Sequence, residues 1–157
     1  MRTFVFTAAG SSYALDASWI QAVHPLVRAR PVPGTPPWLS GVIDVHGELV
    51  PMVDAAMLLS GTAPVQRTLG ARVLLVDTGI AQGGARARFA LAVDRVLDAV
   101  ALEQEGGWRS GAGVVPWLGA VLQHGGEAVQ VLDPLALAAA NPQLAAPAGG
   151  ELAGGAA

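Results

Sequence analysis

The stretch WLSGVIDVHGELVPMVD, Trp38–Asp54, recurs further along the chain as WLGAVLQHGGEAVQVLD, Trp117–Asp133. Extended to Leu58 and Leu137 and aligned without gaps, the two copies are identical at 8 of 21 positions. The two copies share a fold, so residues that are identical in both are expected to maintain that fold. We therefore expect these eight residues to have an architectural role. The identities fall at Trp38, Leu39, Val42, Gly47, Glu48, Val50, Asp54 and Leu58 and at their counterparts 79 positions later.

Upstream of each copy, Tyr13-Ala14-Leu15 matches Phe89-Ala90-Leu91, and Ile20 matches Val96 at the same spacing. Most of the chain consists of short apolar runs separated by turn residues, which is typical of strands and not of helices. The sequence therefore predicts an all-β protein built from two copies of one small barrel, with about five strands per copy. The clearest predicted strands are Thr3–Thr7, Tyr13–Leu15, Val42–Val45, Leu49–Val53, Arg72–Val76, Phe89–Val93 and Val129–Leu132.

Two short helices are predicted, at Ala55–Leu59 and Pro134–Ala140. Each follows an aspartate, Asp54 or Asp133, and aspartate is a favoured N-cap. Pro134 then stands at the first helical position, where its missing N–H costs nothing. Gly47 and Gly126 are predicted to be turn residues whose backbone geometry requires glycine.

Two stretches are not expected to form regular structure. Four prolines between Arg30 and Pro37 predict an extended surface connector. Residues 141–157 are rich in Ala, Gly and Pro and have little bulky apolar surface, so we expect a disordered tail. The predicted organisation is one domain of two similar lobes over residues 1–140, followed by the tail.

Composition narrows the classes of function. The chain has 157 residues, a net charge of −3 and no cysteine, and its nine basic residues are all arginine and scattered. The absence of a basic stripe argues against nucleic-acid binding. No apolar run approaches the ~20 residues that a membrane helix needs, and the N-terminus fits a first strand better than a signal peptide. We expect a cytoplasmic protein, and the Arg, Ala and Gly usage indicates a GC-rich bacterial genome.

No metal site, cofactor site or catalytic pair stands out. The three histidines, His24, His46 and His124, lack the spacing of metal ligands. Asp77-Thr78-Gly79 after an apolar run resembles the active-site loop of retropepsin-type aspartic proteases, in which two carboxylates share a proton. A glycine-rich hairpin explains the same residues, and we expect Asp77 to be solvent-exposed there.

The central stretch Trp38–Asp54 resembles the signature of the CheW family, and the prolines before it and Ala92–Val100 resemble flanking segments of that family. The resemblance covers about Phe4 to Ala140. It implies two intertwined SH3-like five-stranded β-barrels. It also implies a non-catalytic adaptor that couples the cytoplasmic tip of a chemoreceptor to the regulatory domain of a CheA-type histidine kinase.

Carried over position by position, the resemblance implies a receptor-binding surface. Its expected residues are Ile20, Ala22, Gly41, Asp44, His46 and Val96. The chain departs from the family at three of them. The family commonly has Arg at His46, Asn at Asp44 and Glu at Ala22. Since Arg is always charged and His mostly neutral at pH 7, these changes favour a specialised system, such as surface sensing or pilus control. The alternatives are a retropepsin-like protease using Asp77 and an SH3-like binding module with an unrelated partner.

Overall fold

Ten strands form two five-stranded sheets in the computed structural model, which describes residues 1–79, 86–103, 107–109 and 115–145. The first sheet has the strand order β8-β1-β2-β10-β9 and the second the order β3-β6-β7-β5-β4. The strands are β1 (Arg2–Ala8), β2 (Ser11–Asp16), β3 (Ile20–Pro25), β4 (Leu39–Val45), β5 (Glu48–Asp54), β6 (Arg72–Asp77), β7 (Arg88–Val93), β8 (Arg95–Ala101), β9 (Leu118–His124) and β10 (Glu127–Leu132).

The two sequence copies occupy equivalent places. The β4–β5 hairpin of the second sheet corresponds to the β9–β10 hairpin of the first, and each lies at an edge of its sheet. The backbone N–H of Asp54 donates to the Trp38 carbonyl at 2.7 Å, and that of Asp133 donates to the Trp117 carbonyl at 2.9 Å. The prediction that Trp38–Asp54 and Trp117–Asp133 form equivalent strand-turn-strand units is therefore confirmed.

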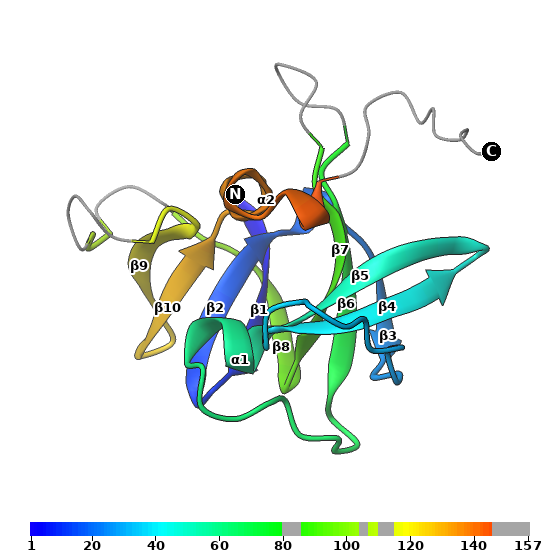
Figure 1. Cartoon of the computed structure of the whole chain (residues 1–157). Coiled ribbons are helices and arrows are strands. Elements are labelled where there is room, and N and C mark those ends of the chain that lie inside the picture. The colour runs from blue at the N-terminus through cyan, green and yellow to red at the C-terminus, as the bar shows by residue number, and fades with distance from the viewer. Residues whose placement is uncertain (80–85, 104–106, 110–114, 146–157) are drawn as a thin grey trace.

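The two halves of the chain are intertwined. β1 and β2 lie in the first sheet with the C-terminal strands β8, β9 and β10, whereas β3, β4 and β5 join β6 and β7 in the second. Figure 1 shows β1 and β2, in blue, in the same part of the molecule as β10, in orange. Neither sheet is complete without strands from both halves.

Each sheet curls toward a barrel but is not closed by a continuous ladder. In the second sheet, edge strand β4 meets the segment after β3 at one bridge, where Val42 and Arg30 exchange hydrogen bonds of 2.8 and 2.9 Å. In the first sheet, Val121 of β9 and Trp108 exchange bonds of the same lengths. The expectation of two SH3-like units thus holds, but each described barrel closes through a single bridge.

Side chains alternate between a shared core and a core private to each sheet, as the period of a strand requires. On β6, Leu74 and Val76 belong to the shared core, whereas Val73 and Leu75 belong to the core inside the second sheet. The shared core also holds Phe6 and Leu15 of the first sheet. The third cluster, inside the first sheet, consists of Val5, Ala14, Leu102, Ala120, Leu122 and Val129.

Short helices close the ends of the sheets. Asp54 caps α1 (Ala55–Leu59) by accepting the Met57 N–H at 3.0 Å, and Asp133 caps α2 (Pro134–Ala140) by accepting two N–H groups. Two 3-10 turns, η1 (Ala17–Trp19) and η3 (Pro142–Leu144), complete the described elements. Among the described residues no helix is long and apolar enough to cross a membrane.

The first five residues of the expected disordered tail are part of the described structure. Residues 141–145 are ordered: η3 forms there, the Leu144 side chain is fully buried in the shared core, and Ala145 forms a bridge with Ala87. The prediction of disorder from Asn141 was wrong for these five residues because one leucine is enough to dock a short turn. Residues 146–157 lie outside the described residues.

Candidate functional site

The tip of the β4–β5 hairpin carries two of the expected receptor-binding residues, Asp44 and His46. Both are exposed. His46 and Gly47 have φ angles of 51° and 85°, and the Gly47 N–H donates to Asp44 Oδ1 at 2.7 Å. Two successive positive φ values are typical of the tight turns that match the twist of a hairpin. Because His is among the residues that tolerate this conformation, its turn geometry alone accounts for its presence.

Gly41 lies deeper on the same hairpin and presents no side chain to a partner. It is buried, its φ is 142°, and a Cβ placed on it would overlap the backbone carbonyl of Arg30. The glycine permits the close approach of β4 to the segment that bridges it. Its place in the candidate site is therefore as support for the hairpin.

The other three expected positions lie on edge strands. Ile20 and Ala22 are half-buried on β3, where Ile20 packs against the shared core and Ala22 against the core of the second sheet. Val96 is half-buried on β8, the edge strand of the first sheet, and also packs against the shared core. The six positions thus lie in three places: the hairpin, β3 and β8. A partner that contacts all three must span both sheets.

Asp77 is not the exposed hairpin residue that the sequence predicts. It is 6% exposed at the end of β6, and Arg86 donates to both of its carboxylate oxygens, at 3.0 and 2.6 Å. The Gly79 N–H donates to Asp77 Oδ1 at 2.9 Å, and Thr78 Oγ1 accepts the Ala87 N–H at 3.0 Å. The Asp-Thr-Gly run therefore closes the base of the β6–β7 hairpin, and the cation from Arg86 makes burial of its carboxylate tolerable.

The ionisation of Asp77 follows from this pairing. Burial by itself raises the pKa of the Asp77 carboxyl, but hydrogen bonds from Arg86 and the Gly79 N–H, with the charges of Arg86 and Arg88, outweigh it. The pKa consequently lies below its ordinary value. A carboxylate held ionised by a guanidinium serves a structural ion pair, whereas aspartic proteases need two carboxylates that share a proton.

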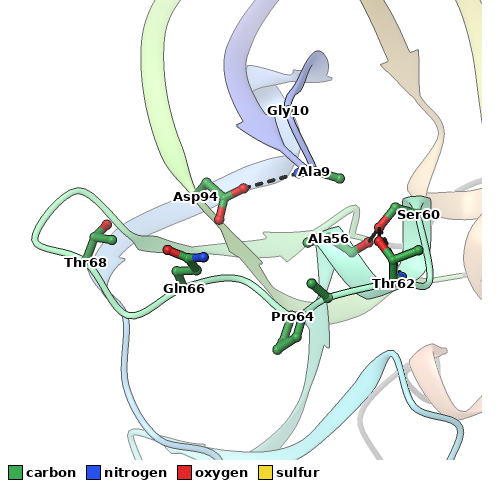
Figure 2. Close-up of a pocket in the computed structure, with 10 residues that line it drawn as sticks. Ala9, Gly10, Ala56, Ser60, Thr62, Pro64, Gln66, Thr68 and Asp94 are labelled. Carbon is green, nitrogen blue, oxygen red and sulfur yellow. Dashed lines mark hydrogen bonds between the residues drawn. The ribbon is translucent and has the colours of Figure 1, made fainter.

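The described residues also offer no metal centre, since no three His, Cys, Asp or Glu side chains gather there. A cavity of about 480 Å³ lies between the β1–β2 turn and the segment after α1, and Figure 2 shows residues that line it. Its lining mixes small apolar residues with polar ones, among them Ser60, Thr62 and Thr68. The one carboxylate in its lining, Asp94, accepts the Ala9 N–H at 3.2 Å and so joins two turns.

Sequence reasoning missed one polar network near the hairpin. Arg88 on β7 forms an ion pair with Glu48 on β5, and Arg88 Nε lies 3.5 Å from Asp77 Oδ2. Because Glu127 repeats Glu48 in the second copy, the sequence predicts only an architectural role for Glu48. The alignment of Tyr13–Leu15 with Phe89–Leu91 places Ser12 opposite Arg88. This difference in charge between the two copies is the sequence feature that could have indicated the network.

Comparison with known proteins agrees with this geometry. The family model described as CheW-like domain matches residues 2–141. The chain belongs to the CheW-like domain family. A search of curated proteins finds no significant match. Among solved structures, this CheW-like domain is similar to the scaffolding protein TtCheW from Thermoanaerobacter tengcongensis, with 19% identity, a TM-score of 0.67, and coverage of 84% of this chain and 88% of that one.

The similarity to TtCheW shows the fold, and the match to the family model shows the protein family. CheW-like proteins are non-catalytic scaffolds, and the CheW-like fold of this chain supports a role as a chemotaxis adaptor. The arrangement of Asp77 agrees with that class, because its carboxylate is engaged in holding a hairpin.

Proposed function

We propose that this CheW-like domain is a cytoplasmic bacterial adaptor that binds the tip of a chemoreceptor and the regulatory domain of a CheA-type histidine kinase. It acts by binding alone and needs no cofactor. Family membership over residues 2–141 is the observation that carries this proposal. Two equivalent sheets with separate outer surfaces suit a protein that contacts two partners at once.

The proposed receptor surface centres on the β4–β5 tip, with Ile20, Ala22 and Val96 as flanking contributors. Support comes from the divergence between the two copies. Asp44-Val45-His46 is replaced by Gln123-His124-Gly125 in the β9–β10 hairpin, although both tips share a glycine with positive φ. Divergence at an exposed tip on a repeated scaffold is expected where one copy binds and the other only completes the fold.

The side chains at this surface also bear on which pathway it serves. With Ala22 and His46 where the family commonly has Glu and Arg, the surface offers less fixed charge, so we propose a specialised receptor such as one for surface sensing or pilus control. Family-typical receptors that present partners for Arg and Glu would then bind more weakly than the cognate receptor.

The test is calorimetric titration of the purified chain with the receptor-tip fragment and the kinase regulatory domain from the source bacterium. His46→Asp should weaken receptor binding by roughly 1–3 kcal/mol without changing the fold. His124→Asp, on the equivalent exposed hairpin, is the matched control and should leave receptor binding unchanged. If the unmodified chain binds neither partner, the adaptor proposal is wrong. If His46→Asp binds like the unmodified chain, the receptor docks elsewhere.

A further inference from the structure

The two equivalent hairpins are attached to their sheets in different ways. In the first sheet, β10 pairs with β2 through Val129–Val131. In the second, β5 pairs with β7 through Met52–Asp54. With the offset of 79 residues, the matching segment of β5 would be 50–52. The ladder of the second sheet thus begins two residues farther from the hairpin tip.

Proline explains the displacement. Pro51 stands where the first copy has Gln130, and proline has no N–H to donate to a ladder. A cleft of about 380 Å³ lies where the ladder is missing, with Leu49, Pro51, Arg88 and Gln143 in its lining. Figure 1 shows the β4–β5 hairpin projecting well beyond the rest of its sheet. The outer half of this hairpin therefore lacks the backbone bonds to a neighbouring strand that its counterpart has.

An ion pair is found at the same place. Arg88 reaches from β7 across the cleft to Glu48, which follows Gly47 of the turn directly. The Arg88 side chain is 19% exposed, and its Nε lies 3.5 Å from Asp77, which Arg86 holds in turn. Arg88 and Asp77 have neutral counterparts in the first sheet. Ser12 occupies the position equivalent to Arg88, and Thr7, which pairs with Ser12, occupies the position equivalent to Asp77. The first sheet has ladder pairs close to the hairpin tip and no such ion pair, whereas the second sheet has the ion pair and a ladder that begins two residues farther from the tip.

Packing restrains only one side of the hairpin. Val50 is 1% exposed, and Ile43 and Val45 pack against the core of the second sheet. On the opposite side, Leu49 is 72% exposed. Apolar packing is not directional, whereas a charge-assisted hydrogen bond has a preferred geometry, so the Glu48 contact can set the angle at which the tip stands.

We propose that Arg88 is a positioning residue that ties the outer half of the β4–β5 hairpin to β7 through Glu48 and thereby fixes the pose of Asp44 and His46. Behind the Arg88 side chain lies the Asp77 carboxylate, 3.5 Å from Arg88 Nε, an electrostatic contact without a hydrogen bond. The consequence for receptor binding rests on the proposed function, whereas the tether itself does not.

The experiment measures amide hydrogen exchange of residues 43–49 by NMR in the full chain, together with receptor-fragment titration. Arg88→Met and Glu48→Gln should each speed exchange at the tip by about 2–5-fold, the range expected for one partly exposed ion pair. The variant with both substitutions should exchange no faster than either single variant, because each substitution already removes the same ion pair. Arg88→Lys should restore part of the protection, and high salt should speed exchange in the unmodified chain only.

Glu127→Gln, at the equivalent position of β10, is the matched control and should leave exchange of its own hairpin unchanged. If Arg88→Met does not fold, Glu48→Gln tests the tether instead. The Glu48 side chain is 61% exposed, so its substitution should leave the fold intact. Unchanged exchange at residues 43–49 overturns the tether whatever the receptor does. Faster exchange with unaltered receptor affinity overturns the positioning role, and faster exchange in a chain that binds no receptor fragment overturns the adaptor proposal alone.

Discussion

Two glycines of the β4–β5 hairpin are required for different physical reasons. At Gly47 a Cβ would meet nothing within 4 Å, so only its φ of 85° opposes a side chain. At Gly41 a Cβ would overlap the carbonyl of Arg30, and φ is also positive. The first glycine shapes a turn, and the second lets two backbones approach.

Gly41→Ala should therefore destabilise the fold by roughly 3 kcal/mol or more, since backbone strain and overlap add. Gly47→Ala should cost only about 1 kcal/mol. Chemical denaturation of the two variants measures the difference. Equal losses would show that β4 and the Arg30 segment are not in close contact.

Asp77→Asn should cost about 1–3 kcal/mol at neutral pH, because Arg86 and Arg88 would lose a buried ionised partner. Since the pKa of Asp77 in the folded chain lies below its ordinary value of 3.8, ionised Asp77 contributes fully well above pH 3.8. The contribution is lost as pH falls below 3.8 toward the folded-state pKa. Denaturation midpoints of the two proteins should thus converge in acid. A difference that stays constant down to pH 2 contradicts the ion pair.

At the scale of elements, the C-terminal turn η3 is the smallest unit that completes the shared core. Leu144 supplies its anchor, with no exposed surface, and the Leu144 N–H donates to the Asn141 carbonyl at 2.9 Å. A short turn of this kind gains its stability from the side chain it buries.

Truncation after Asn141 should accordingly lower stability by roughly 2–4 kcal/mol, the usual cost of removing a buried leucine. Truncation after Ala145 should cost little, as the composition of the remaining twelve residues predicts. Thermal unfolding of the two truncated chains and of Leu144→Ala distinguishes the contributions. A large loss on removing 146–157 alone would show that those residues dock on the body.

At the scale of the whole molecule, the chain passes from the first sheet to the second before β3 and returns to the first before β8. Each sheet therefore contains strands from both halves of the chain. A cut after Arg67, an exposed residue, would leave β1–β5 on one fragment and β6–β10 on the other. Each sheet would then need strands from both fragments.

Neither fragment, 1–67 or 68–157, should fold alone, because each would expose half of the shared core. An equimolar mixture should recover the strand signal of the intact chain in circular dichroism and the dispersed amide spectrum in NMR. A dispersed spectrum from either fragment by itself would mean that the lobes fold independently.

Much of the fold could be predicted from the sequence, because its main signals are local or repeated. The alternation of apolar residues marks the strands, the aspartates before Ala55 and Pro134 mark the helix starts, and the repeat shows that two hairpins are equivalent. The Trp38–Asp54 signature identifies the family, which implies the intertwined arrangement. Each of these inferences depends on residues close in sequence or on comparison of one segment with another.

Only the tertiary structure decided how distant side chains pair. Arg86 lies nine positions from the buried Asp77, and Arg88 lies forty from Glu48. Whether such residues meet depends on strand order and register, which no local pattern encodes. The burial of Asp77 and the docking of Leu144 share this cause. The sequence by itself determined the two-copy β scaffold and its turns, and the strand order and pairing in the second sheet decided which charges meet and how much of the β4–β5 hairpin is paired to a neighbouring strand.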